Sequence, residues 1–437
     1  MDLSQFNELT SSHQADNEMY HLMTELFGIC RSITGNGVRK SLNMIKKYVD
    51  LEIHEVKSGT KVYDWIIPKE WNINDAYVID PDGKKIIDFK SSNLHVVSYS
   101  IPVNKKMSLA ELKPHLHTLP DQPDVIPYLT SYYNENWGFC ISHKEFLKLK
   151  EGEYQVFIDS TLNEGSLTYG EYYLKGNNKE ETLISCYICH PSMCNDNLSG
   201  VVIVTMLAHY LKNINLNHSI RFLFIPETIG SITWLSLNEK KLSNIKHGLV
   251  VTCAGDQGIS TYKKSRRGNT TIDKTVEYVL KKSGQSYSIM DFFPTGSDER
   301  QFCSPYFNLP VGSLMRTMYG NFKEYHTSAD NLDFVKKEAL FDTYLKYLKI
   351  IFILENNKIY TNLNPKCEPQ LGKRGLYRDI GGQKITKDTE NAIFWVLNLC
   401  DGTNSLLDIA ERSKIDFEIL LEAAQKLENK GLLKSKP

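Results

Sequence analysis

The stretch TLISCYICHPSMCNDNLSGVVIVTMLAHYL, residues 182–211, decides how this chain folds. It begins with an apolar run of the length of a buried strand and ends with a longer run, 201–211, suited to a buried helix. The polar residues between the two runs therefore lie at the carboxyl end of a strand. Further strands are expected at 219–226 and 247–253, with helices between them. Residues 165–355 thus predict an α/β fold with a mostly parallel sheet and helices on both faces.

The sequence on either side of this α/β part has a different texture. Residues 63–164 alternate short strand-like runs with turn signals, which predicts an inserted, mostly β domain. The helical N-terminus belongs with the α/β part, so the predicted catalytic domain covers 1–62 and 165–362. Three short amphipathic helices over 365–437 outline a winged-helix-like domain, and its last residues, LLKSKP, are expected to begin a hairpin.

The composition is that of an ordinary globular protein. The chain has 437 residues, 41% of them apolar and 24% charged, and a formal net charge of -1. This balance argues against a polybasic nucleic-acid-binding protein. No apolar run reaches about 18 residues and no secretory signal opens the chain, so we expect no membrane span. The nine cysteines lie mostly inside apolar runs and suggest buried free thiols, hence a cytoplasmic protein.

Acidic and imidazole side chains follow the predicted strands in succession. Ligands of open α/β sheets collect at the carboxyl ends of the strands, so these side chains should converge on one rim. Histidine and carboxylate without thiolate is the ligand set of a catalytic zinc site. Singly, each residue also fits a helix cap, a loop or a surface ion pair; their order and spacing together favour the metal site. The six residues are His190, Asp196, Glu227, Asp256, Asp298 and His326.

These segments resemble those of the co-catalytic zinc aminopeptidases. The string HPSMCNDNLSG, residues 190–200, resembles the metal-binding segment of that family, in which Asp-Asn-x-Ser-Gly opens a helix. Pro226-Glu227, the loop 295–302 (TGSDERQF) and Tyr325-His326-Thr327 are similar to the family's general-base, Ser-Asp and last-histidine segments. The resemblance covers about residues 165–355. The layout is also similar to that of bacterial aminopeptidase-like proteins with an inserted β domain and a C-terminal winged helix.

The resemblance implies a role for each residue of the predicted site. The implied metal ligands are His190, Asp196 and His326, with Asp256 as a fourth candidate. Glu227 is implied as the general base, which takes a proton from a zinc-activated water and delivers it to the leaving amine. Asp298 would orient a ligand imidazole. Tyr325 would donate a hydrogen bond to the developing oxyanion.

Two positions depart from the family pattern. Thr228 stands where the family has a second glutamate that binds metal, and Ser192 stands where it often has an aspartate. A neutral hydroxyl replaces a carboxylate poorly as a metal ligand. We therefore expect one zinc site and leave a second metal open.

The resulting functional prediction is a metal-dependent hydrolase that cleaves an amide bond, as an aminopeptidase-type exopeptidase acting on a peptide-like or amide-containing small substrate. One alternative is a deacylase, amidohydrolase or cyclase of the same fold, because a fold does not determine a reaction. Another is a non-catalytic metal- or ligand-binding regulatory protein, suggested by Thr228 and by the added helical domain.

A winged helix raises the question of DNA binding. Residues 365–437 contain 12 basic and 11 acidic residues, and the predicted recognition helix, 416–431, is rich in acidic ones. Because phosphate contacts supply most DNA affinity, nucleic acid is not expected as a partner. The C-terminal domain is better suited to a protein partner or to a homo-oligomer.

Three further motifs have two interpretations each. Cys186-Tyr-Ile-Cys189-His190 fits a haem attachment pattern, although its position in an apolar run favours buried thiols. The basic cluster 263–268 and Arg316 are either surface residues or a clamp for an anionic group of the substrate. The aromatic residues of 127–140 form either a wall over the site or, as we favour, the core of the insertion.

Overall fold

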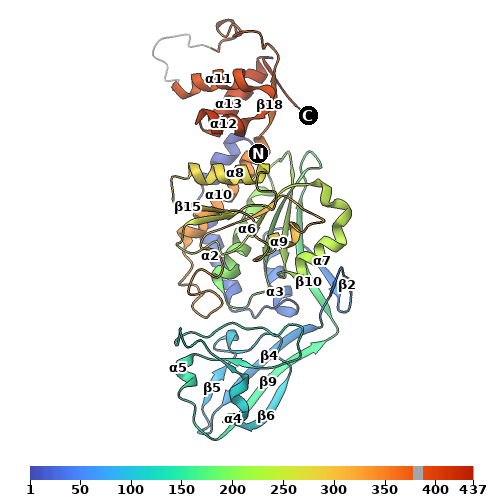
Figure 1. Ribbon diagram of the computed structural model, residues 1–437, viewed down its shortest axis with the longest axis vertical. Helices are drawn as coiled ribbons and strands as arrows, with labels where there is room; N and C mark the ends of the chain where they lie inside the picture. The colour runs from blue at the N-terminus through green and yellow to red at the C-terminus, as the bar shows by residue number, and fades with distance from the viewer. Residues whose placement is uncertain (377–386, 437) are drawn as a thin grey trace. The chain divides into compact units, whose positions relative to one another are not determined.

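The computed structural model of the protein describes residues 1–376 and 387–436 (Figure 1). It divides into two compact units, one of Ser11–Lys346 and one of Met1–Thr10 with Tyr347–Pro437. The division falls within the long helix α10 (Lys337–Asn356). The residue limits proposed above for the three domains stay predictions.

The larger unit contains an eight-stranded sheet in the order β1-β10-β12-β11-β13-β16-β14-β15. The four strands from β12 to β16 in this order run parallel, whereas β1, β10 and β14 join by antiparallel pairing. The predicted mostly parallel sheet is therefore confirmed for its centre. The strands are β1 (Glu52–Lys57), β10 (Ser166–Leu174), β11 (Glu181–Tyr187), β12 (Ser219–Ile225), β13 (Ile245–Val251), β14 (Ser260–Lys263), β15 (Tyr287–Met290) and β16 (Val311–Met315).

The apolar runs of the sequence explain the centre of this sheet. Strand β11 is buried along its whole length, as a strand with helices on both faces must be. Helix α6 packs on β11, β12 and β13, and it is apolar almost all round because both the sheet and neighbouring helices cover it. Trp234 of α7 and Phe302 of α9 join Leu183 in a separate core cluster.

Helices of the larger unit that lie outside the insertion accordingly cover both faces of the sheet (Figure 1). They are α2 (Gln14–Phe27), α3 (Asn36–Ile45), α6 (Ser199–Leu211), α7 (Ile229–Asn238), α8 (Thr271–Lys282) and α9 (Glu299–Phe302).

The predicted β insertion is confirmed as a separate four-stranded antiparallel sheet in the order β5-β4-β9-β6. Its core includes Val78, Phe139 and Val156, against which Trp137 packs. A capping box formed by Ser108 and Glu111 starts helix α4. The elements are β2 (Lys61–Val62), β3 (Trp65–Ile66), β4 (Glu70–Ile79), β5 (Lys85–Asp88), β6 (Val103–Ser108), α4 (Leu109–Leu112), β7 (Leu116–His117), β8 (Phe139–Cys140), α5 (His143–Phe146) and β9 (Glu153–Asn163).

The described part of the smaller unit combines helices with a three-stranded sheet in the order β18-β17-β19, and it includes the end of α10. The predicted last strand, β19, pairs antiparallel with β17, far earlier in the chain. The elements are α1 (Leu3–Ser11), which begins in this unit, β17 (Ile359–Asn362), α11 (Lys387–Leu399), β18 (Asp401–Ser405), α12 (Leu406–Ser413), α13 (Phe417–Asn429) and β19 (Leu433–Ser435).

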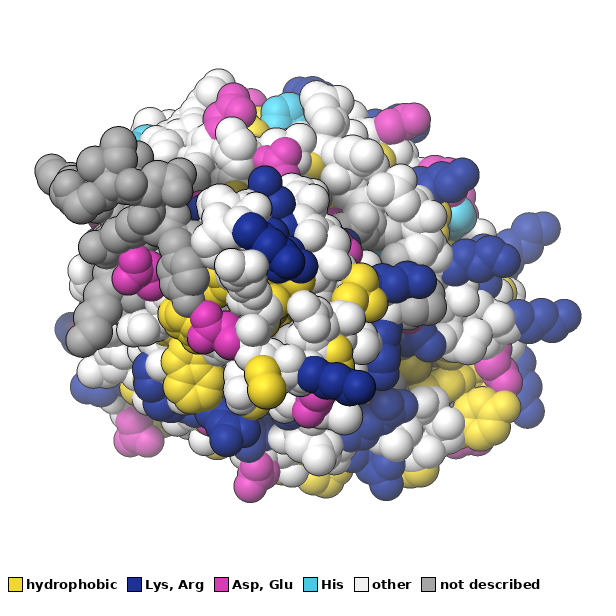
Figure 2. All heavy atoms as spheres, turned by 90° about the horizontal axis from the view of Figure 1, so that it is seen from above, with side chains coloured by type: hydrophobic (Ala, Val, Ile, Leu, Met, Phe, Trp, Pro, Cys, Tyr) yellow, Lys and Arg dark blue, Asp and Glu magenta, His cyan; other side chains and the backbone are white. Residues whose placement is uncertain are grey.

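The surface charge and the helices concern two expectations from the sequence, namely a balanced charge and the lack of a membrane span. On the face shown in Figure 2, basic, acidic and hydrophobic side chains lie interspersed. Within residues 1–376 and 387–436, no helix is both long enough and apolar enough to cross a membrane.

Candidate metal centre

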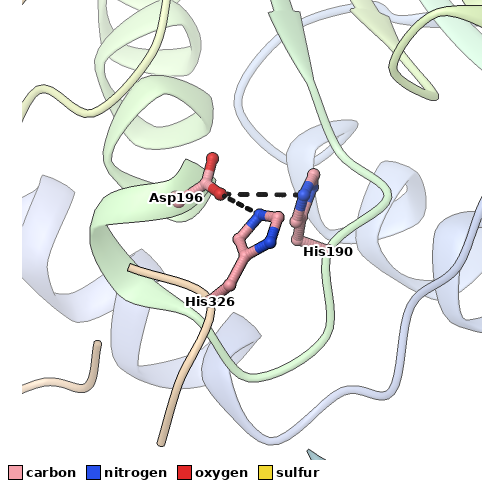
Figure 3. A group of neighbouring side chains, drawn as sticks. All are labelled: His190, Asp196 and His326. Carbon is pink, nitrogen blue, oxygen red and sulfur yellow. Dashed lines mark ion pairs between the residues drawn. The ribbon is translucent and has the colours of Figure 1, made fainter. Parts of the chain in front are cut away.

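Three side chains from distant parts of the chain meet beyond the carboxyl end of β11 (Figure 3). His190 follows β11, Asp196 lies just before α6, and His326 lies in the loop between β16 and α10. The Oδ2 atom of Asp196 is 3.0 Å from Nε2 of His326 and 3.7 Å from Nε2 of His190. One ligand atom from each residue lies within 4.8 Å of the other two.

This group fits a zinc ion. Two imidazoles and a carboxylate are zinc ligands, and bonds of about 2.0–2.2 Å at tetrahedral angles place such ligand atoms about 3.3–3.6 Å apart. Asp196 Oδ2 and His326 Nε2 are buried, yet neither has a hydrogen-bond partner among the described residues. Two buried polar atoms facing one another without a hydrogen bond are costly unless a cation lies between them.

The orientation of Asp196 is determined by its other oxygen. Oδ1 accepts a hydrogen bond from the hydroxyl of Tyr187, the last residue of β11, and that hydroxyl lies 2.6 Å from the Thr252 hydroxyl. Only Oδ2 is therefore left toward the two histidines. Tyr187 was not among the residues predicted for the site, because a tyrosine inside an apolar run looks like a core residue.

Asp330 is a second residue of the site that no sequence motif indicates. Its Oδ1 accepts from the backbone N–H of Asn195 at 2.6 Å, and its Oδ2 accepts from that of Asp196 at 2.9 Å. Burial raises the pKa of Asp330 to about 8, although both donors favour its charged form. The Asp330 carboxyl group thus holds the loop that carries Asp196. Its position, four residues after His326, is the only sequence signal that could have indicated it.

The backbone of His190 is held by a buried arginine. Arg31 donates from Nε to the carbonyl oxygen of His190 at 2.8 Å and from Nη2 to that of Pro191 at 3.2 Å. Its third bond, from Nη1, reaches the carbonyl of Leu26 at the end of α2. The N-terminal helices therefore help to place the first histidine.

Glu227 lies beside the group at the carboxyl end of β12. Its Oε2 is 3.8 Å from Nε2 of His190, and its backbone N–H donates to Sγ of Cys189. Burial and the charges of Asp298 and Asp196 raise the pKa of Glu227 well above its ordinary value. Its side chain keeps 27% of its surface exposed, so it can still reach a bound molecule.

Asp298 does not contact either histidine. Its Oδ1 accepts from the backbone N–H of Thr228 at 2.7 Å and from the hydroxyl of Ser231 at 2.8 Å, and its burial raises its pKa to about 6. Arg300 donates from Nη2 to the Thr228 hydroxyl at 2.7 Å. These bonds hold the segment next to Glu227, so Asp298 positions that segment and not the imidazole we expected.

Asp256 lies outside the group, in contrast to its expected place as a fourth ligand. Its Oδ1 accepts from the Thr317 hydroxyl at 2.5 Å and from the Gly258 N–H at 2.6 Å. Its Oδ2 accepts from Nδ2 of Asn195 at 3.0 Å and from the Thr317 N–H at 3.1 Å. Both oxygens are thus already engaged by protein donors, which leaves them poorly placed to bind an ion.

Two aromatic rings pack against the histidines. Tyr325 stacks on His326 with ring centroids 4.0 Å apart and an interplanar angle of 12°, and burial raises its pKa. Tyr128, from the β insertion, lies 5.2 Å from His326 and 5.6 Å from His190 between ring centroids. The aromatic residues of 127–140 therefore divide: Tyr128 borders the site, whereas Trp137 and Phe139 belong to the core of the insertion.

Some residues of the remaining motifs have structural explanations. Lys263 is buried and donates to Glu299 Oε1 at 2.7 Å, and Arg316 pairs with Asp342 at 2.7 Å, so neither is free to clamp an anion. Cys186 and Cys189 are buried free thiols, which does not suit an exposed haem attachment site.

Comparison with known proteins agrees with this architecture. Residues 20–357 match the family model described as a domain of unknown function (DUF4910), and residues 358–435 match a winged helix-turn-helix model. A Clostridium acetobutylicum protein named for polysaccharide biosynthesis and an aminopeptidase-like domain is 60% identical over 426 residues, 98% of each chain.

Solved structures give the same assignment of the fold. A crystal structure from Clostridium acetobutylicum, named for a peptidase, is 57% identical over the whole of both chains, with a TM-score of 0.95. The zinc aminopeptidase BSAP of Bacillus subtilis is 14% identical over 78% of this chain and 95% of its own, with a TM-score of 0.56. The α/β unit therefore has the zinc aminopeptidase fold, and the expected C-terminal winged helix is confirmed.

Proposed function

Because the chain belongs to the family described as a domain of unknown function (DUF4910), its activity has to be inferred from its site, and we propose that it is a zinc-dependent hydrolase of amide bonds. The observation that supports this is the pair of buried, partnerless atoms Asp196 Oδ2 and His326 Nε2, 3.0 Å apart beside His190. The peptidase fold of the structural neighbours agrees with a hydrolase of this type.

The zinc ligands are His190, Asp196 and His326. When bound, zinc supplies a Lewis acid that polarises the amide carbonyl and lowers the pKa of water. Glu227 accepts the proton of the attacking water as the new C–O bond forms. It then delivers that proton to the amine nitrogen as the C–N bond breaks. The Tyr325 hydroxyl, stacked beside His326, donates to the oxyanion.

The protein binds one zinc ion per chain. Thr228, next to the general base, offers a neutral hydroxyl, and that hydroxyl already accepts a hydrogen bond from Arg300. A guanidinium at this position repels a second divalent cation and supplies positive charge of its own near Glu227. The arrangement therefore favours a single metal.

The substrate is a small peptide-like or amide-containing molecule. The name of the Clostridium relative, which refers both to polysaccharide biosynthesis and to an aminopeptidase-like domain, agrees with an amide on a peptide or on a sugar conjugate. The nine free thiols suit a reducing compartment, which supports a cytoplasmic location.

The winged helix serves a protein contact or self-association and does not bind nucleic acid. The first turn of α13 carries Glu418, and its exposed residues include Glu422 beside Lys426. An acidic or charge-paired helix is unsuited to the phosphate backbone of DNA. Weak retention on heparin together with a concentration-dependent sedimentation coefficient would support this assignment, and tight DNA binding at physiological salt would oppose it.

Activity of the purified full chain tests the proposed hydrolase. We expect about one zinc per chain by elemental analysis and hydrolysis of aminoacyl reporters that is lost on chelation. Glu227→Gln should lower kcat by about 10²–10⁴-fold without lowering the zinc content. Glu135→Gln, at an exposed glutamate of the insertion, is the matched control and should leave kcat unchanged. Fully zinc-loaded protein without hydrolysis of any peptide or sugar amide would refute the proposal in favour of a binding protein.

A further inference from the structure

A cavity of about 820 Å³ opens beside His326, between the β insertion and the loop that carries this histidine. The insertion supplies one wall from residues 116–119, Gln122 and residues 127–129, and the loop supplies the other from residues 320–323, Tyr325 and His326. Tyr128 and Tyr325, the two rings that pack against the metal group, both line it. Its volume is that of a pocket for a small molecule.

Backbone hydrogen bonds join the two walls. The N–H of Tyr128 donates to the carbonyl of His326 at 2.8 Å, and the N–H of Ser328 donates to the carbonyl of Ile126 at 2.8 Å. The Ile126 N–H in turn donates to the Ser328 hydroxyl at 3.0 Å. The insertion is thus bonded to the segment that carries a metal ligand, and the cavity is formed before any ligand binds.

The cavity wall presents neutral hydrogen-bonding groups that the protein itself does not use. The side chains of His117 and Gln122 from the insertion and of Asn321 from the loop make no hydrogen bond with any described residue. Burial and the nearby His115 lower the pKa of His117, so its ring is neutral and carries both a donor and an acceptor. Side-chain amides likewise offer both.

The charges of the lining restrict the ligand further. No aspartate or glutamate lines the cavity, so a free ammonium group would find no counter-ion there. The ammonium of Lys323 is the one cation in the lining, and its side chain is exposed to solvent. Each hydroxyl of a sugar both donates and accepts, which matches the neutral imidazole and the two amides. The rings of Phe322 and Tyr325 offer apolar surface for the C–H face of such a ring.

We propose that this cavity binds a neutral, hydroxyl-bearing sugar ring of the substrate, whose amide then lies at the metal group. This assignment rests on the proposed amide hydrolase and makes the β insertion the part of the chain that selects the substrate. A ligand whose ammonium group lies in this cavity, by contrast, finds no carboxylate in the lining.

Ligand-observed NMR and calorimetry on the full zinc-loaded chain test this, with N-acetyl-D-glucosamine as the probe and L-leucinamide as the peptide-like comparison. We expect the sugar to bind and L-leucinamide not to compete with it. Gln122→Leu and Asn321→Leu, on opposite walls, should each raise the Kd for the sugar tenfold or more. Gln370→Leu, an exposed glutamine of the smaller unit, is the matched control and should leave Kd unchanged.

Two results overturn the sugar assignment: no measurable sugar binding, or a Kd that both wall variants leave unchanged. Binding of L-leucinamide that Gln122→Leu abolishes would also overturn it, in favour of a peptide substrate. Zinc content and hydrolysis measured on the same samples separate the two proposals. Sugar binding with the expected variant effects supports the cavity even when no amide is cleaved, in which case only the hydrolase is refuted.

Discussion

Removal of the Asp330 carboxylate should destabilise the larger unit and weaken zinc binding together. The side chain is fully buried, and its two oxygens accept the backbone N–H groups of Asn195 and Asp196 at 2.6 and 2.9 Å. Alanine at this position leaves both donors buried without an acceptor. Since each unsatisfied buried donor costs about 1–3 kcal/mol, Asp330→Ala should lower the free energy of unfolding by about 2–6 kcal/mol.

Asparagine gives an intermediate result from the same geometry. Its carbonyl oxygen can keep one of the two N–H bonds, whereas its NH₂ group faces the other donor, so Asp330→Asn should cost about half as much as alanine. Because the held loop carries Asp196, both variants should also bind zinc about 10–100-fold more weakly.

Urea unfolding of the metal-free chain measures the first effect, and competition with a chelator measures the second. Asp333→Asn is the control: Asp333 is exposed, and its replacement should change the unfolding free energy by less than about 0.5 kcal/mol. If the unfolding free energy of Asp330→Ala also lies within about 0.5 kcal/mol of that of the natural chain, the two N–H groups do not depend on Asp330, which would refute the prediction.

Three further predictions concern stability away from the site. Arg39 lowers the pKa of Glu70 from 4.5 to about 2. Arg39→Met should therefore lower the free energy of unfolding by about 1–3 kcal/mol at pH 7, and this difference should shrink below pH 4.5 and vanish near pH 2. A difference that stays constant across this pH range would contradict the prediction. Burial lowers the pKa of His247 from 6.5 to about 3, so its contribution to stability is full above pH 6.5 and is lost as the pH falls toward 3. His247→Gln should therefore flatten the pH dependence of the urea midpoint in this window. Midpoints of the variant and the natural chain that fall in parallel with pH would count against the prediction. Lys263→Met leaves Glu299 buried without its partner and should lower the free energy of unfolding, measured with urea or heat, by about 3–5 kcal/mol. Combining Lys263→Met with Glu299→Gln should restore much of this loss. A double variant as unstable as the single one would contradict the pairing.

The parts of the fold that the sequence predicted are those encoded by local patterns. The apolar run that ends at Tyr187 and the run of α6 appear as a buried strand and a buried helix, because each must be covered on several sides wherever it lies in the fold. His190 and Asp196 follow from the same rule, since parallel strands end at one edge of the sheet. The partner of the last strand could not be predicted from a local pattern, because β19 pairs with a strand more than seventy residues earlier.

The positions of carboxylates along the chain did not reveal their partners. Asp256 and Asp298 follow strands as a ligand would, but each is bonded to groups 61 to 70 residues away that no local pattern indicates. Asp330 is joined to donors 134 and 135 residues earlier, and Tyr128 comes from the insertion. The position of an acidic residue after a strand makes it a candidate metal ligand, but it does not show which of the candidates faces the metal site.

The sequence by itself therefore determined the α/β architecture and the C-terminal winged helix, and it indicated the residues of the candidate metal site. Apolar periodicity and residue type are local properties, and burial acts on them in the same way in any arrangement of the chain. The tertiary structure alone decided which side chains face one another: the approach of His326 to Asp196, the support from Asp330 and the wall supplied by the insertion. Hydrogen bonds act over about 3 Å and depend on orientation, so contacts between residues far apart in the chain are set only when the whole core has packed.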